Sequence, residues 1–303
     1  MRAALSWAHA RAKGEEGLQL AAALAPFWEF RGHIAEGRRR LEELLAAVQG
    51  SPGARARALN AAGFLTMRAG DGRASLALYE ESLALRRAQG DTWGMAVALN
   101  NAANAHIELG EYAQAESVYT EVLEIFRAAG DQWGVATAFN NLSVAARELG
   151  QYERAEALAK ESLALRRAQD DPRGVAEATN SLAQVASAQG RHEQAAALFT
   201  AGLLLSKEVG DMLRLLEALE GLAWAAAALG QPQRAARLGA AAEAERERLG
   251  LPLGLPDRTR HDRAILAINA ALGAEAFAAA WAKGRDVTLA ETIALALTAD
   301  PAG

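Results

Sequence analysis

The sequence predicts an all-α protein built as a linear array of paired helices, and two periodic columns of residues support this fold class. Glycines recur at a constant interval in the first column, as Gly70, Gly110, Gly150, Gly190 and Gly230. A second column with the same spacing reads Gly90, Gly130, Asp170, Gly210 and Gly250. The composition agrees, because 51% of the 303 residues are hydrophobic and many of these are alanine, the strongest helix former. A fixed period of roughly 20–50 residues is typical of stacked repeats, which form a solenoid.

We expect residues 1–50 to form an irregular N-terminal helical repeat. The stretch Phe27-Trp28-Glu29-Phe30-Arg31-Gly32-His33 supplies a turn glycine. The interval from Gly32 to Gly70 is shorter than the later glycine intervals, so this unit departs from the regular array. Gly50-Ser51-Pro52-Gly53 then gives the first clear break in the chain.

Residues 51–250 are expected to form five 40-residue repeats, each with two helices. In one repeat Asp91 directly follows Gly90; aspartate is a preferred N-cap, and glycine suits the left-handed residue that ends the preceding helix. The first helix is expected to run to about residue 109, and the second over about 112–129. Small residues at one repeat position predict close helix crossings, at Ala115, Ala155, Ala195 and Ala235.

The period stops at residue 250, and residues 251–303 are expected to form a C-terminal helical cap. Leu251-Pro252-Leu253-Gly254-Leu255-Pro256 predicts a rigid connector. Helices are then expected over about 257–272, through Phe277 and Trp281, and near 289–297. An atypical terminal unit is typical of a repeat array, because the array must cover its exposed end faces.

Several functional classes are excluded by composition and motifs. A net charge of −5 argues against a nucleic-acid-binding surface, which needs a basic stripe. The absence of cysteine excludes disulfides and thiolate metal sites, and the five histidines show no metal-ligand spacing. No catalytic triad, phosphate-binding loop, signal peptide or ~20-residue apolar span is present in the sequence. We therefore expect a cytoplasmic protein without catalytic activity, metal or cofactor, and without direct contact to nucleic acid or membrane.

The recurring motifs resemble those of the tetratricopeptide repeat. They are Leu142-Ser143, Gly150-Gln151-Tyr152 and Ala155 in one repeat, and Leu182-Ala183, Gly190, Ala195 and Phe199 in the next. The resemblance implies a right-handed superhelix of antiparallel helix pairs, about six repeats long, in which the first helix of each repeat lines a concave groove. The usual repeat of that family is about 34 residues long, so the longer unit of this chain extends each helix by most of a turn.

The two ends of the chain carry a narrower resemblance. At the start the motifs are Arg2-Ala3-Ala4-Leu5-Ser6-Trp7-Ala8, Phe27-Trp28, Arg31-Gly32-His33 and Glu36-Gly37-Arg38-Arg39-Arg40-Leu41; at the end they are Leu272-Gly273, Ala276-Phe277, Ala280-Trp281, Gly284-Arg285 and Leu289. These are similar to the limits of the repeat region in LuxR-type or cyclase-associated bacterial signal-transducing ATPases, including regulators like the maltose-regulon activator. In that class the repeat array is the sensor arm, which implies a peptide, small-molecule or protein ligand. The ATPase and output modules of the class are missing from this sequence.

A column of asparagines is the strongest candidate binding site. Asn60, Asn100, Asn140 and Asn180 occupy the same position of successive repeats, with Asn101, Asn141 and Asn104 beside them. An amide both donates and accepts hydrogen bonds, so this asparagine column could pair with the backbone of an extended peptide in the groove. The alternative is that the amides bond to each other or to the backbone between adjacent repeats, which satisfies them without any ligand.

Tryptophans provide further candidate contacts. Trp224 is at a groove-facing repeat position and could give the groove an apolar patch, or it could pack in the core. Trp93 and Trp133 follow the helix caps; they could anchor a partner or pack over the turns between repeats.

The sequence therefore predicts a protein- or peptide-binding repeat scaffold that holds its ligand in the concave groove, as the sensor or interaction arm of a bacterial signalling or transcriptional regulator. The alternative is a structural scaffold that self-associates and has no ligand in the groove. The sequence does not predict the oligomeric state.

Overall fold

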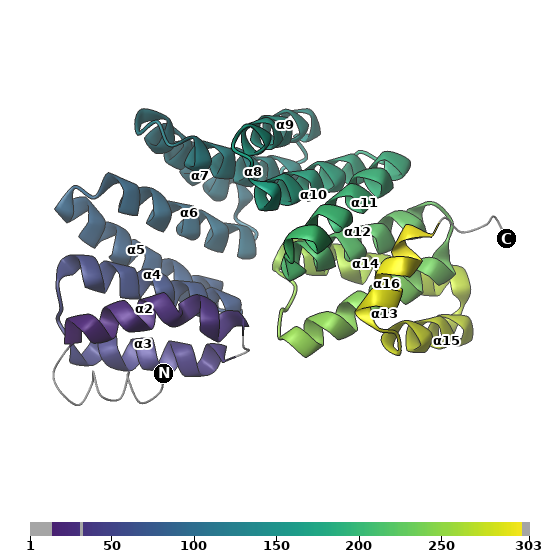
Figure 1. Cartoon of the computed structure of the whole chain (residues 1–303), viewed down its shortest axis with the longest axis horizontal. Coiled ribbons are helices and arrows are strands. Elements are labelled where there is room, and N and C mark those ends of the chain that lie inside the picture. Colours follow the sequence, from purple (N-terminus) through teal and green to yellow (C-terminus); the bar gives the residue numbers. More distant parts are fainter. Residues whose placement is uncertain (1–13, 31–32, 299–303) are drawn as a thin grey trace. The chain divides into compact units, whose positions relative to one another are not determined.

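A computed structural model describes residues 14–30 and 33–298, and this part of the chain is entirely helical, with fifteen α-helices and no strand (Figure 1). The expected all-α fold is confirmed. The motifs at Arg2–Ala8 and Gly32 lie outside the described residues. The chain divides into two compact units, Met1–Asp131 and Gln132–Gly303, which we call the first and second units. The division expected from repeat regularity, at residues 50 and 250, stays a prediction.

The first unit is a stack of helix pairs. Its helices are α2 (Gly14–Phe30), α3 (Ile34–Ala47), α4 (Pro52–Arg68), α5 (Gly72–Gln89), α6 (Thr92–Glu108) and α7 (Tyr112–Ala128). Helices that follow each other in the chain pack together, and α2, α4 and α6, the first helices of their pairs, also contact one another in turn. We call the surface formed by such first helices the first-helix face of a unit.

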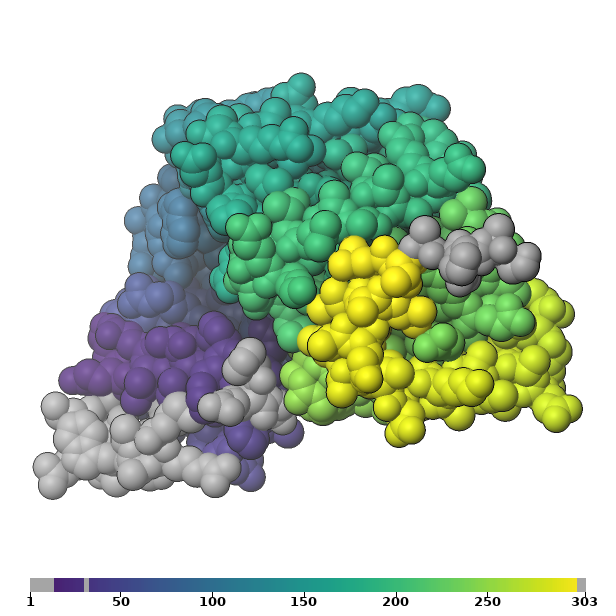
Figure 2. Space-filling view, turned by 45° about the vertical axis from the view of Figure 1, so that its right-hand side comes forward, coloured from purple at the N-terminus to yellow at the C-terminus, as the bar shows by residue number. Residues whose placement is uncertain are grey.

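The second unit continues the same pattern and then departs from it. Its helices are α8 (Gln132–Glu148), α9 (Tyr152–Ala168), α10 (Pro172–Ala188), α11 (His192–Val209), α12 (Met212–Ala228), α13 (Pro232–Leu249), α14 (Leu255–Leu272), α15 (Ala274–Arg285) and α16 (Leu289–Leu297). The first helices α8, α10 and α12 contact one another in turn, and α14 contacts α12. The last helix, α16, packs on α13 and α12 at the surface of this unit (Figure 2).

The helix ends follow the repeat signals. The Asp91 carboxylate accepts the Gly94 N–H at 2.9 Å, so it caps α6, and Gly90 ends α5 in the left-handed conformation with φ 66°. Both features were expected from the sequence. At the equivalent place two repeats later stands Asp170, with φ 50°, the one non-glycine residue of positive φ among the described residues. A side chain in this conformation costs about 1–2 kcal/mol relative to glycine, which explains the glycine at four of the five positions.

Close helix crossings use the small residues that the sequence places there. Ala115, Ala155, Ala195 and Ala235 are fully buried. At another crossing, a Cβ added to Gly63 of α4 would lie 2.7 Å from the Tyr79 ring of α5, so only glycine fits against that ring. Within the described chain, no helix is both long and apolar enough to cross a membrane.

Candidate functional site

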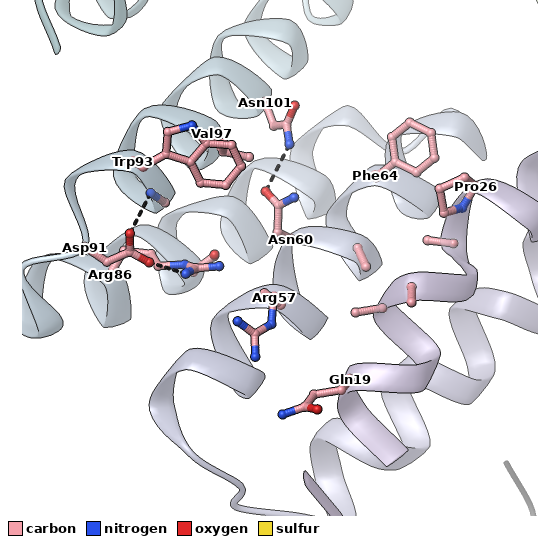
Figure 3. Close-up of a pocket in the computed structure, with 16 residues that line it drawn as sticks. Gln19, Pro26, Arg57, Asn60, Phe64, Arg86, Asp91, Trp93, Val97 and Asn101 are labelled. Carbon is pink, nitrogen blue, oxygen red and sulfur yellow. Dashed lines mark hydrogen bonds and ion pairs between the residues drawn. The ribbon is translucent and has the colours of Figure 1, made fainter. Parts of the chain in front are cut away.

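The first-helix face of the first unit contains an open groove of about 770 Å³ (Figure 3). Its lining comes from α2, α4 and α6, with a floor from α5: Gln19, Ala22, Ala23, Ala25, Pro26, Arg57, Asn60, Ala61, Phe64, Ser82, Arg86, Asp91, Trp93, Gly94, Val97 and Asn101. Most of the lining is apolar, with a few polar groups among it. That combination is typical of a ligand-binding cleft.

Helical periodicity explains why these side chains share one surface. On α4, Arg57, Asn60 and Phe64 are spaced by three or four residues, so they lie on one side of the helix. On α6, Trp93 and Val97 follow the same rule, and Trp93 is 63% exposed at the edge of the groove. An exposed tryptophan beside an apolar cleft offers a large contact area to a partner.

A pair of amides bridges the two principal helices of the groove. The Asn101 Nδ2 donates to Asn60 Oδ1 at 3.0 Å, from α6 to α4 (Figure 3). Each amide side chain can make more than one hydrogen bond. Within the described residues, no other hydrogen bond uses the Asn60 amide nitrogen or the Asn101 amide oxygen, and both residues are only half-buried. The pair therefore presents oriented donors and an acceptor to the groove.

The charges of the groove are arranged around Asp91. The Gly94 amide, the Arg86 guanidinium that donates to Asp91, and the nearby charge of Arg57 together lower the pKa of the Asp91 carboxyl against the opposing effect of burial. Arg57 itself is exposed, and among the described residues it makes no hydrogen bond or ion pair. Arg57 is thus a cation available to an acidic group of a ligand.

The other asparagines of the column have different surroundings. Asn104 accepts a hydrogen bond from the buried Tyr119 hydroxyl at 2.5 Å. Asn180 is 1% exposed, and its Nδ2 donates to the Arg214 carbonyl of the next repeat at 2.8 Å. Asn140 is also buried, at 5% exposure, while Asn100 and Asn141 are half-buried and have polar partners. The alternative interpretation described both kinds of inter-repeat bond: amide to amide, as between Asn60 and Asn101, and amide to backbone, as between Asn180 and Arg214.

Trp224, the remaining predicted site residue, lies in the second unit. It is half-buried on α12, and the Arg260 guanidinium of α14 lies 5.7 Å from the centre of its ring. The geometry is that of a cation–π contact within the chain. Trp224 is therefore covered by a neighbouring helix of the same unit.

Of the groove residues, only Asn60 and Asn101 were among the predicted site residues, and Gln19, Arg57 and Phe64 are examples of those that were not. Arg57 and Phe64 carried a usable signal, because they lie three and four residues from Asn60 and so share its helical face. Gln19 carried none, since α2 belongs to the irregular first repeat. No cluster of potential metal ligands occurs in the described ranges 14–30 and 33–298.

Comparison with known proteins supports the repeat assignment. Residues 54–128 and 94–168 match the tetratricopeptide repeat family. No curated protein is similar enough in sequence to be matched. The narrower resemblance to signal-transducing ATPases stays a prediction.

Solved structures share the fold at low sequence identity. BtubC (BKLC) from P. vanneervenii is 21% identical with a TM-score of 0.56, over 68% of this chain and 86% of that one. NprR in complex with its cognate peptide NprX is 18% identical with a TM-score of 0.57, over 88% and 70%. A Rap protein complexed with competence and sporulation factor is 14% identical with a TM-score of 0.58, over 93% and 80%. These similarities show a tetratricopeptide-like solenoid fold.

Proposed function

We propose that this protein is a binding scaffold whose first unit holds an extended peptide or protein segment in the groove of α2, α4 and α6. The amide pair Asn60–Asn101 carries the proposal. Its free donors and acceptor face a largely apolar cleft, where they can bond to the backbone of an extended chain.

The other groove residues add specificity to this backbone recognition. Trp93 and Phe64 offer apolar contact for side chains of the ligand. Arg57 offers a positive charge, so a segment with an acidic residue is favoured over a basic one. Of the asparagine column, Asn60 and Asn101 contact the ligand directly in this proposal. The buried amide of Asn180 joins two repeats in the second unit.

The biological setting of the proposal is the interaction or sensor arm of a bacterial signalling or transcriptional regulator. Two structures of the same fold, NprR and the Rap protein, are peptide-bound or factor-bound complexes, which supports a peptide as the ligand class. The motifs at the chain ends support the regulator assignment. The proposed protein performs no catalysis and uses the groove only for binding.

A self-associating scaffold with an empty groove is the second candidate. The exposed side chains Trp93 and Trp133, at 63% and 59%, could serve an interface between copies. Light scattering over a concentration series separates the two functions. A monomer at micromolar concentration supports the binding scaffold, whereas a tight oligomer that buries Trp93 supports self-association.

The direct test is a displayed library of extended peptides selected on the full chain, followed by affinity measurement with the selected peptide. Asn60→Ala combined with Asn101→Ala should weaken binding on the order of tenfold or more, since each hydrogen bond contributes about 1 kcal/mol. Trp93→Ala should weaken it on the order of thirtyfold if the ring is a binding hot spot.

Repeat-equivalent variants provide matched controls. Asn141→Ala and Trp133→Ala make the same substitutions at the equivalent positions of the next repeat, in the second unit. Both should leave the affinity unchanged within a factor of about two, with helicity preserved. If these control variants lose binding and the first-unit variants keep it, the ligand does not bind in the proposed groove.

A further inference from the structure

The helix α14 does not pack as an ordinary member of the array. Of the helices that follow α13, α15 packs along it most extensively, whereas α14 makes only small contacts, with α12, α13 and α15 alike. Of its 18 residues only Pro256 and Ile268 are buried. By contrast, α13 of the same length buries eight residues: Ala235, Ala236, Leu238, Gly239, Ala240, Ala241, Ala242 and Arg246. The hairpin partner of α13 is therefore in place without α14.

A polar latch attaches α14 to the first-helix face of the second unit. Arg260 Nη2 lies 2.9 Å from Asp257 Oδ1 on α14 itself and 3.3 Å from Glu148 Oε1 on α8, 112 residues earlier in the chain. The same guanidinium lies 5.7 Å from the centre of the Trp224 ring on α12. The side chain of Arg260 thus contacts both α8 and α12 on the first-helix face of the second unit. We call Glu148, Trp224 and Arg260 the α14 latch.

The side of α14 that faces solvent is polar in its first half, where Arg258, Asp262 and Arg263 are exposed, and apolar in its second half. Leu266 is 69% exposed, and Ala267, Ala270 and Ala271 are also exposed.

Toward the rest of the unit, α14 packs through Ile268, with the half-buried Ala264 and Leu272, in an apolar cluster formed with α12, α13 and α15, and Arg260 adds polar contacts. Because α14 buries far fewer residues than α13, and partly exposed ion pairs contribute about 0–1 kcal/mol, its contact can open at a lower cost than that of α13. The segments beside α14 also permit movement, since Gly273 has φ 79°, a conformation that glycine adopts readily.

We propose that the first-helix face of the second unit is a binding site for an arginine-bearing helix, and that α14 is its built-in occupant. A partner helix whose arginine reaches Glu148 and Trp224 competes with α14 for this face. When α14 is displaced, its buried Ile268 joins the already exposed Leu266 as an apolar surface that a partner can cover. This inference is independent of whether the first-unit groove binds a peptide.

Hydrogen exchange on the full chain tests the latch. Arg260→Glu reverses the charge opposite Glu148 and should raise the amide exchange of residues 255–272 roughly tenfold, with α13 unchanged. Arg263→Glu makes the same charge change on the exposed side of α14, where no described residue pairs with Arg263, and should have little effect. Arg260→Lys keeps the charge and should keep most of the protection. Equal exchange of α14 in the Arg260→Glu and Arg263→Glu proteins overturns the latch.

Binding in trans tests the site itself. The probe is a fluorescent synthetic peptide with the sequence of residues 255–272, measured by anisotropy against the full chain. It should bind the Arg260→Glu protein, whose face is vacated, at least tenfold more tightly than the wild-type protein. A peptide that carries Arg260→Glu should lose that binding. The proposed site is overturned if hydrogen exchange shows that α14 detaches in the Arg260→Glu protein, but the peptide binds the Arg260→Glu and wild-type proteins equally or binds neither.

Discussion

The two units present the same repeat positions in different states. In the first unit the face of α2, α4 and α6 is open, and its amide pair and Trp93 are accessible to solvent. In the second unit the corresponding face of α8, α10 and α12 is partly covered by α14, whose Arg260 reaches Glu148 and Trp224. Repeat equivalence therefore fixes the position of a side chain on its helix and leaves open whether that side chain is accessible.

The asparagines show how this difference arises. Asn101 hydrogen-bonds across the open groove to Asn60, whereas Asn180 hydrogen-bonds to the Arg214 backbone in a buried crossing. At that crossing, a Cβ added to Gly202 would lie 1.9 Å from Asn180 Oδ1, so the glycine allows α11 to approach the amide. At this crossing, the glycine on the neighbouring helix thus makes room for the buried amide.

The largest expected effect concerns a buried ion pair that the first unit lacks among its described residues. Glu220 and Arg246 are 3% and 7% exposed and join α12 to α13, with Arg246 Nη2 donating to Glu220 Oε2 at 2.9 Å. Glu220→Ala leaves the guanidinium buried without its carboxylate, so the free energy of unfolding should fall by about 3–5 kcal/mol. Urea denaturation measures this loss.

The control for that prediction is Glu245→Ala, which removes the more exposed pair with Arg248 on the same helix. It should change the free energy of unfolding by less than about 1 kcal/mol. At low temperature, where the Glu220→Ala protein is still folded, peptide binding in the first unit should be unchanged, because the substitution lies in the second unit. Equal costs for the two variants would show that burial of the Glu220 pair contributes nothing.

Asparagine substitutions give the next largest effect and sharpen the comparison directly. Asn180→Ala removes the hydrogen bond from a buried amide to the Arg214 carbonyl, so it should cost about 1–1.5 kcal/mol of stability. Asn101→Ala removes a half-buried bond in the open groove and should cost at most about 1 kcal/mol. Thermal and urea unfolding of both variants measure the difference. If Asn101→Ala lowered the stability more than Asn180→Ala, the structural amide would be the one in the first unit and the accessible amide the one in the second.

The smallest effect is the pH dependence of the Asp91 cap at the groove edge. The Gly94 amide and the Arg86 guanidinium hold the folded-state pKa of Asp91 below its usual 3.8. The contribution of Asp91 to stability is therefore complete above pH 3.8 and is lost as the pH falls through the folded-state pKa. Asp91→Ala should cost about 1 kcal/mol at pH 7 and progressively less below pH 4.

Asp71→Ala is the matched control, since Asp71 caps α5 through the Ala74 N–H at 3.0 Å without an arginine partner. At pH 7, Asp71→Ala should lower the free energy of unfolding by an amount similar to that of Asp91→Ala, because it also removes an N-cap. Urea unfolding at pH 7 and pH 3 compares the two variants. A cost for Asp91→Ala that does not change between these pH values would contradict the electrostatic account of the groove edge.

The fold was largely predictable from the sequence because its signals are local and repeated. The Gly90 and Asp91 caps, the helix limits and the buried alanines each follow from short-range geometry that recurs in successive repeats. The three helices after residue 250 were also placed correctly. The start and end of each of these helices are again set by local sequence signals.

The site was only partly predictable. The groove pairs Asn60 with Asn101, and not with its repeat equivalent Asn100, because one residue turns a side chain by about 100° around a helix. The covering of Trp224 depends on Arg260 and Glu148, which are 112 residues apart in sequence. No local pattern encodes such a contact.

Hydrogen exchange of the full chain with and without a selected peptide tests most directly whether the first unit is the binding unit and the second is closed by its own helix. The account predicts that saturating peptide slows exchange in α4 and α6 and leaves α8, α10, α12 and α14 unchanged. Protection that appears in α8, α10 and α12 together with faster exchange in α14 would contradict it. In that case the peptide would have replaced α14, and the ligand would belong to the second unit.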